Sequence, residues 1–165
     1  MISAQQIMGL NPSHVVAVDD QHFLLPEVRD VFREMQHAAA SAGLDFQICS
    51  SFRNFDKQLS IWNRKWQGEL PLYSPDGKTL DPQALSDNEK MHAILTWSAL
   101  PGGSRHHWGT DFDFYDKTTI DAQSHRLALI PEEFEGNGPC AKLATWVHTH
   151  AQRYGFYLPY ANFKG

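Results

Sequence analysis

Cysteine is scarce in this chain, which has only Cys49 and Cys140 among its 165 residues. Two thiols are too few to build a disulfide scaffold, so the fold must depend on a hydrophobic core. We expect both cysteines to be reduced and partly buried, with a single bridge between them as the alternative. Apolar runs of membrane-spanning length are also lacking, which excludes a membrane segment within this sequence.

Basic residues are outnumbered, because 14 Lys and Arg stand against 19 Asp and Glu, giving a formal charge of −5 and a pI near 5.9. A nucleic-acid partner requires a basic face, so none is expected. The N-terminus has no Lys or Arg before its apolar residues and no clear cleavage site, unlike a secretory signal. We therefore expect a cytoplasmic location for the chain as written, with the periplasm or cell envelope as the alternative.

Apolar residues make up 42% of the sequence and aromatic residues 12%, which is typical of a folded globular protein. The length suits one domain spanning 1–165. Irregular alternation of helices and strands favours the α+β class, with a small antiparallel central sheet flanked by helices. Periodicity and turn residues predict helices over 26–42, 54–67, 87–99 and about 139–155, strands over 44–51, 110–116 and 156–160, and a surface loop over 68–88.

The run "SRHHWGTDFD" concentrates imidazoles and carboxylates in ten residues. His106 follows a Gly-Gly break, and Asp113 projects from the strand predicted after it. Because the chain can reverse at Gly109, the two side chains can converge on one ion. An imidazole and a carboxylate suit zinc, which takes three protein ligands and one water in catalytic sites. The alternative is an ordinary capped turn before a strand.

The same run resembles the Ser-x-His-x-x-Gly-x-x-x-Asp signature of the zinc-dependent D-alanyl-D-alanine carboxypeptidases, the VanY-type group. Ser104, His106, Gly109 and Asp113 occupy the four fixed positions. The resemblance implies a hedgehog/DD-peptidase-like fold.

Two further segments extend this resemblance over about residues 46 to 160. "SSFRNFDKQLSIWNRK" is similar to the family's Ser-x-x-Arg-Ser-x-x-x-Gln segment and places Arg53 and Gln58. "WVHTHAQRYGFYLPY" is similar to the stretch in which an aromatic helix leads into a Tyr-Gly-Phe strand.

The resemblance assigns roles to five residues. His106 and Asp113 are expected to bind Zn²⁺, and Arg53 to stabilise the oxyanion formed when water attacks the peptide carbonyl. Gln58 and Ser104 are expected to bind substrate. The alternatives are a surface salt bridge for Arg53, a solvated helix face for Gln58 and a loop-stabilising role for Ser104.

His107 falls at a variable position of the signature. We expect it to form a pocket wall and not to bind the metal.

The family pattern includes a further motif, Glu-x-x-His, which supplies the third zinc ligand and the general base. The sequence has no Glu after Glu135 and no His after His150. We therefore expect these 165 residues to be a peptidase domain lacking its C-terminal end. With two ligands and no base, the polypeptide should bind zinc weakly and have little or no peptidase activity.

The favoured function is a zinc-dependent D-alanyl-D-alanine carboxypeptidase acting on peptidoglycan-derived peptides. One alternative is an endopeptidase that cuts within the stem peptide, and another is a non-catalytic muropeptide-binding module of the same fold. A cytoplasmic role in recycling wall peptides reconciles this substrate with the absence of an export signal. The sequence does not indicate an oligomeric state.

Overall fold

Short strands and helices alternate along the chain without a repeating βαβ unit in the computed structural model, which describes residues 2–159. The helices are α1 (Ala4–Ile7), α2 (Pro26–Ser41), α3 (Phe55–Trp66), α4 (Asp87–Trp97), α5 (Lys117–Ala122) and α6 (Ala141–His150), and the 3-10 helices are η1 (Arg105–Trp108), η2 (Pro131–Glu133) and η3 (Ala151–Tyr154). The strands are β1 (Val16–Ala17), β2 (Phe23–Leu24), β3 (Phe46–Ser50), β4 (Leu72–Tyr73), β5 (Thr79–Leu80) and β6 (Asp113–Asp116). This is the predicted α+β class with small antiparallel sheets.

The central strand pair is β3 with β6, which run antiparallel. Ile48 pairs with Phe114, whereas Ser50 pairs with Asp113, so Cys49 is an extra residue that forms a β-bulge. Bulges bend a strand and re-aim its side chains. The irregularity therefore lies beside the first residue of β6, Asp113.

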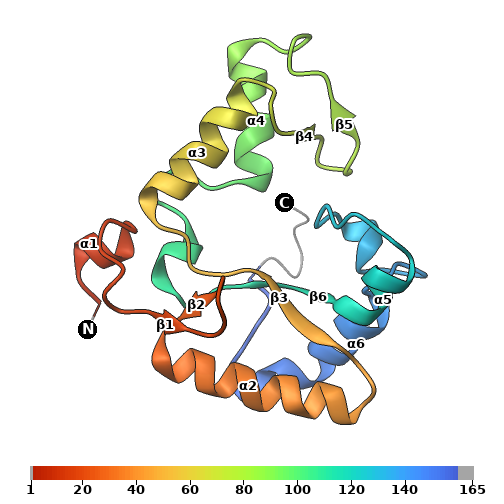
Figure 1. The fold of residues 1–165 in the computed structure, drawn as a ribbon. Coiled ribbons are helices and arrows are strands. Elements are labelled where there is room, and N and C mark those ends of the chain that lie inside the picture. Colours follow the sequence, from red (N-terminus) through yellow and green to blue (C-terminus); the bar gives the residue numbers. More distant parts are fainter. Residues whose placement is uncertain (1, 160–165) are drawn as a thin grey trace.

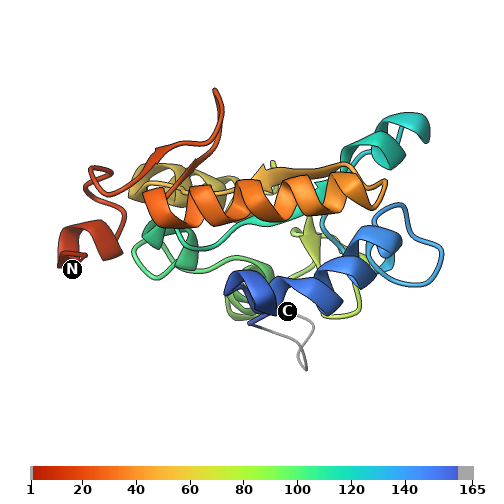
Figure 2. The same ribbon diagram turned by 90° about the horizontal axis from the view of Figure 1, so that it is seen from below.

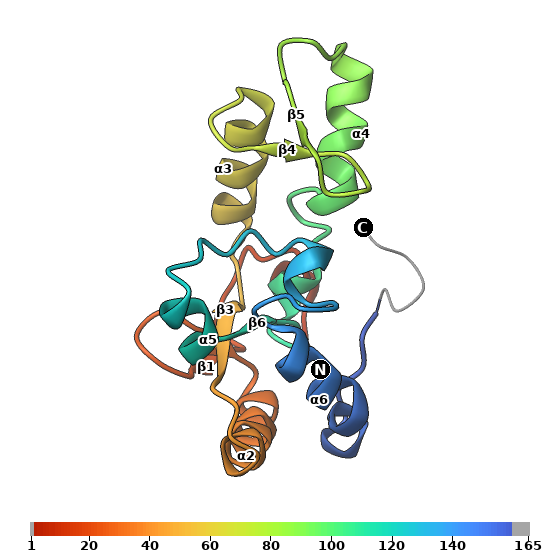
Figure 3. The ribbon, with the colours of Figure 1, turned by 90° about the vertical axis from the view of Figure 1, so that its right-hand side faces the viewer.

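The hydrophobic core lies between this strand pair and the helices α2 and α6, which Figures 2 and 3 place on the same side of the pair. Phe112 and Phe114 both point into the core, as the alternation of the strand predicts. Edge-to-face contacts join Phe32 to Phe46 and Phe112, with ring centroids 5.4 and 5.1 Å apart. The buried core residues are Leu24, Phe32, Met35, Ala39, Phe46, Ile48, Leu143, Val147 and Ala151.

An arm formed by α3, the β4–β5 hairpin and α4 stands on the opposite side of the strand pair from α2 (Figure 1). Asn54 begins α3 by accepting a hydrogen bond from the Lys57 amide at 2.8 Å. A capping box between Ser86 and Glu89 begins α4. Arg53 donates a hydrogen bond to Gln58 of α3, so the arm contacts the predicted site.

Three predicted elements need correction. The segment 68–88 is not all loop, because it contains the β4–β5 hairpin. The predicted strand over 110–116 begins only at Asp113, and α5 follows it directly with Asp116 as its N-cap. Residues 156–159 form no strand, and the end of that prediction, Tyr160, lies outside the described residues.

Among residues 2–159, none of the helices combines the length and the apolar character needed to cross a membrane.

Candidate active site

The His106 and Asp113 side chains meet where η1 leads into β6. His106 Nε2 lies 3.4 Å from Asp113 Oδ2. Gly109 makes this convergence possible, since it ends η1 with a left-handed φ of +71°. A Cβ at Gly109 would collide with Val15 Cγ1 and lie 3.2 Å from the Leu25 nitrogen. Both the backbone angle and the close approach therefore require glycine.

The separation of these two atoms suits a shared zinc ion. Zinc binds imidazole nitrogen and carboxylate oxygen at about 2.0–2.2 Å, so two ligands of a tetrahedral ion lie roughly 3.3–3.5 Å apart. The observed 3.4 Å falls in this interval. Within residues 2–159, however, no cluster of three or more His, Cys, Asp or Glu side chains is arranged to hold a metal. The described residues thus offer two ligands.

Arg53 approaches the same carboxylate, with Nη2 3.8 Å from Asp113 Oδ2. Its Nη1 donates a 3.0 Å hydrogen bond to Gln58 Oε1, and its Nε is buried with no hydrogen-bond partner in the part of the chain that the structure describes. Desolvation lowers the pKa of Arg53, while the charges of Asp113 and Asp111 act in the opposite direction. A desolvated guanidinium with an unused N–H is suited to an incoming anionic group.

Gln58 is 1% exposed, so the alternative of a solvated helix face is wrong. Its Oε1 accepts from Arg53, and its Nε2 donates to the Ala99 carbonyl at 2.7 Å. The Gln58 amide thus links the Arg53 guanidinium to the backbone of Ala99, which follows α4. Direct binding of substrate by Gln58 stays a prediction.

Ser104 precedes η1 and is 2% exposed. Its carbonyl accepts the His107 amide at 3.1 Å, which helps to close the 3-10 turn. This contact fits the loop-stabilising alternative. A hydrogen bond from its hydroxyl to a substrate remains a prediction.

The electrostatics keep Asp113 ionised. Desolvation raises its pKa, but the hydrogen bond to His106, the charges of His106 and Arg53 and a hydrogen bond from Ser50 outweigh it and lower the pKa below the ordinary value. The carboxylate is therefore in its metal-binding form at neutral pH.

His107 is completely buried, so the expectation that it forms a pocket wall is wrong. Its Nδ1 lies 2.6 Å from the Arg53 carbonyl oxygen, and its Nε2 lies 3.0 Å from the Gly102 amide. Desolvation lowers its pKa, so the ring is neutral at pH 7. The sequence signal for such a role is weak, because two adjacent histidines do not reveal which one faces inward.

A cleft of about 880 Å³ opens beside Arg53 and Asp113. Several of its lining residues come from distant segments and carry no sequence signal for a cleft: Pro12, Val15, Cys49, Lys57, Ile61 and Leu129. Lys57 adds a cation to the wall. The cleft therefore joins the predicted site to a space that can hold a ligand.

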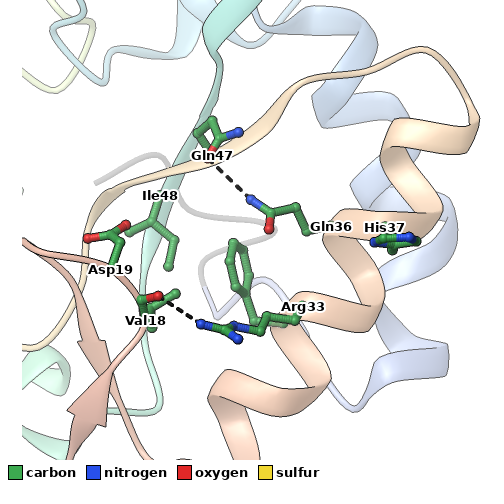
Figure 4. A pocket seen from close by; sticks show the side chains of 8 residues that line it. Val18, Asp19, Arg33, Gln36, His37, Gln47 and Ile48 are labelled. Carbon is green, nitrogen blue, oxygen red and sulfur yellow. Dashed lines mark hydrogen bonds between the residues drawn. The ribbon is translucent and has the colours of Figure 1, made fainter.

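A separate cavity of about 360 Å³ lies between α2 and β3, and Figure 4 shows the polar side chains around it. Arg33 donates to the Val18 carbonyl at 3.0 Å, and Gln36 donates to Gln47 Oε1 at 3.2 Å. None of the five predicted site residues lines this cavity. The larger cleft is thus the one that belongs to the site.

Both cysteines are free thiols. Cys140 is buried, whereas Cys49 is exposed and lines the cleft, so the expected partial burial fits neither residue and the alternative of a bridge between them is wrong. Desolvation and the nearby charges of Asp113 and Glu133 raise the pKa of Cys49 to about 11.

Residues 21–165 match the family model described as VanY, D-alanyl-D-alanine carboxypeptidase. An uncharacterised protein of Haemophilus influenzae is 37% identical over 103 residues, which is 60% of this chain and 70% of that protein. A second uncharacterised protein of the same organism is 30% identical over 74 residues, covering 45% of this chain and 56% of that protein.

Solved structures share the fold at low sequence identity. VanYB in complex with D-alanine-D-alanine aligns with a TM-score of 0.61 and 17% identity over 87% of this chain and 64% of that one. The LdcB LD-carboxypeptidase aligns with a TM-score of 0.61 and 20% identity over 94% of this chain and 62% of that one. A mutant of the D,D-pentapeptidase VanY in complex with Zn(II) aligns with a TM-score of 0.51 and 17% identity over 86% of this chain and 89% of that one. The chain spans less than two thirds of the VanYB and LdcB chains that it matches.

Proposed function

The chain belongs to the VanY family of D-alanyl-D-alanine carboxypeptidases, and on that premise we propose that it removes the terminal D-alanine from peptidoglycan-type peptides in a zinc-dependent reaction. One observation carries the proposal. His106 Nε2 and Arg53 Nη2 lie 3.4 and 3.8 Å from the same oxygen of Asp113, and Arg53 and Asp113 line a cleft of about 880 Å³. Fold similarity to zinc-bound and D-alanyl-D-alanine-bound proteins supports the choice of metal and substrate.

His106 and Asp113 are the residues that would hold the zinc ion. The ion supplies Lewis-acid polarisation of a carbonyl and increased acidity of a bound water. A third protein ligand is not offered by residues 2–159, so the pair alone should bind zinc less tightly than a three-ligand site.

Arg53 acts on the charge that develops during hydrolysis. Water adds to the carbonyl carbon of the last peptide bond, and the carbonyl oxygen gains negative charge. The guanidinium donates hydrogen bonds to this oxygen, which lowers the barrier because the donor is already oriented by Gln58. The C–N bond then breaks, the amine of the departing D-alanine takes up the protons that the attacking water has lost, and the shortened peptide is left with a carboxylate.

Two cationic side chains, Arg53 and Lys57, line the cleft. A peptide that ends in D-alanine carries a free carboxylate. Lys57 is placed to attract that carboxylate, which favours cleavage of the terminal residue over cleavage within the stem.

The test is to incubate the zinc-supplied chain with a stem pentapeptide ending in D-alanyl-D-alanine and to identify the products by mass spectrometry. Slow release of free D-alanine is expected from the wild type, because two zinc ligands without a general base activate water poorly, and no release is expected from His106→Ala. Two longer peptide fragments would indicate the endopeptidase alternative. Saturable binding of the peptide without any product would indicate a muropeptide-binding module.

A further inference from the structure

His107 makes two hydrogen bonds that select one form of its ring. The Arg53 carbonyl can only accept, so Nδ1 carries the proton across the 2.6 Å contact. The Gly102 amide can only donate, so Nε2 accepts it at 3.0 Å without a proton. The buried ring thus ties the Arg53 peptide unit to the Gly-Gly break that precedes η1.

The backbone of Arg53 is held on both sides by consecutive residues of η1. Its amide donates to the His106 carbonyl at 3.2 Å, and its carbonyl accepts from His107 Nδ1. His106 directs its ring at the candidate metal position, and His107 binds the Arg53 carbonyl. The two residues are neighbours in one turn. A shift of this turn would move His106 and Arg53 together.

An N-terminal segment that precedes the family-model match contacts both the ring and the backbone of His107. Gly9 has a φ of +74°, and a Cβ there would lie 2.5 Å from His107 Nδ1. The Gly9 carbonyl accepts from the Phe55 amide at 2.9 Å, while His14 Nε2 donates to the His107 carbonyl at 3.0 Å. Gly9 and His14 both precede the matched residues, which begin at residue 21.

We propose that His107 is a positioning residue that sets the place of Arg53 beside Asp113, that Gly9 leaves the space its ring needs, and that His14 holds its backbone carbonyl. The catalytic consequence rests on the proposed function, whereas the placement of Arg53 does not. Displacement of the Arg53 guanidinium by about 1 Å can lower the reaction rate by as much as 100-fold. A residue that never touches substrate can therefore control turnover.

Two substitutions separate positioning from simple support of the fold. His107→Leu fills much of the space but leaves the Arg53 carbonyl and the Gly102 amide buried without partners. His107→Asn keeps a donor where Nδ1 stands and loses only the acceptor for Gly102. Both variants should be less stable, but only the leucine variant should release Arg53. His148→Leu is the control, because His148 is exposed on α6.

The first measurement is nitrogen-15 NMR of the 165-residue chain without substrate. In the wild type we expect the His107 ring to show a protonated Nδ1 and an unprotonated Nε2, and the buried Arg53 Nε–H to give a separate, slowly exchanging signal. His107→Leu should merge that signal with those of exposed arginines, while His107→Asn and His148→Leu keep it. The opposite ring tautomer in the wild type would overturn the proposal even if no variant folds.

The second measurement is a double-mutant cycle with Arg53→Lys on the release of D-alanine by the zinc-supplied chain. His107→Leu should lower kcat by about 10- to 100-fold alone and by less than about twofold in the Arg53→Lys background. The same factor in both backgrounds would mean that His107 does not act through Arg53. If the wild type releases no D-alanine, the proposed function fails, and the NMR result still decides the placement of Arg53.

Discussion

His106 Nε2 lies 3.4 Å from Asp113 Oδ2, although the two residues are seven positions apart in the sequence. The 3-10 turn η1 and the left-handed Gly109 bring the imidazole back toward the start of β6. Arg53 Nη2 lies 3.8 Å from the same Oδ2 atom. The site is thus an acidic group that contacts both an imidazole and a guanidinium, which is an arrangement that can bind a cation and then stabilise an anion.

Removal of either proposed ligand should abolish zinc binding. A single remaining ligand leaves the ion almost fully hydrated, so His106→Ala and Asp113→Asn should each weaken zinc affinity by about 100-fold or more. Isothermal titration of the 165-residue chain with zinc checks this. His92→Ala, on the exposed face of α4, serves as the control and should bind zinc as the wild type does. Unchanged affinity in both ligand variants would exclude a metal site at these two residues.

Arg53→Gln should separate metal binding from turnover. Loss of an oxyanion donor lowers kcat by about 10²- to 10³-fold. Zinc affinity should rise slightly, because a cation 3.8 Å from Asp113 no longer repels the metal. Parallel zinc titration and D-alanine release measure the two effects. A fall in both quantities would indicate that Arg53 supports the fold of the site and not its chemistry.

Glycine at position 109 should be far more important for stability than glycine at position 43. Gly109→Ala introduces left-handed strain and a collision with Val15, and we expect the free energy of unfolding to fall by about 3 kcal/mol. Gly43 has a similar φ of +78°, but a Cβ at this position would meet no atom within 4 Å, so Gly43→Ala should cost only about 1 kcal/mol. Urea denaturation of both variants tests the difference. Equal losses would argue against the close packing of the N-terminal segment on Gly109.

Alkylation of Cys49 should be slow at neutral pH and should accelerate with pH. The pKa near 11 leaves about one thiolate in 10³ at pH 8, so the rate should be about 100-fold below that of an ordinary cysteine. Because a raised thiol pKa favours the protonated form, the rate should increase about tenfold per pH unit until roughly pH 10.5. Mass spectrometry of iodoacetamide-treated Cys140→Ala protein follows the reaction.

The same assay tests the neighbourhood of Cys49. Asp113 is one of the charges that raise the pKa of this thiol, so Asp113→Asn should increase the alkylation rate at pH 8. A rate in Asp113→Asn no higher than in the parent protein would contradict the placement of Cys49 near this carboxylate.

Elements with strong local signals are predictable from the sequence. Pro26 at the start of α2 and Asn54 at the start of α3 define those helices, and both helices are confirmed within one or two residues. The α5 helix is not among the predicted elements, although Asp116 is its N-cap, because the six-residue helix has little apolar periodicity of its own. The two-residue strands β4 and β5 depend on pairing with each other and on the contact of β4 with α4, and they have no local pattern to reveal them.

The residues of the site are predictable from the sequence, but the hydrogen bonds that connect them are not. The signature places His106 and Asp113 on one turn and strand, and the structure brings them together. The bond from His107 to Arg53 joins residues 54 positions apart, and Gln58 reaches Ala99 across 41 positions. Such contacts depend on tertiary packing, so periodicity and spacing carry no trace of them.

The central claim is that His106 and Asp113 share one zinc ion beside Arg53. A crystal of the zinc-soaked chain, measured across the zinc absorption edge, tests it most directly. We predict one anomalous peak about 2.0–2.2 Å from both His106 Nε2 and Asp113 Oδ2. A peak in contact with neither side chain would contradict the claim. So would the absence of metal between His106 and Asp113 at saturating zinc, with Arg53 and Asp113 closed into a direct ion pair.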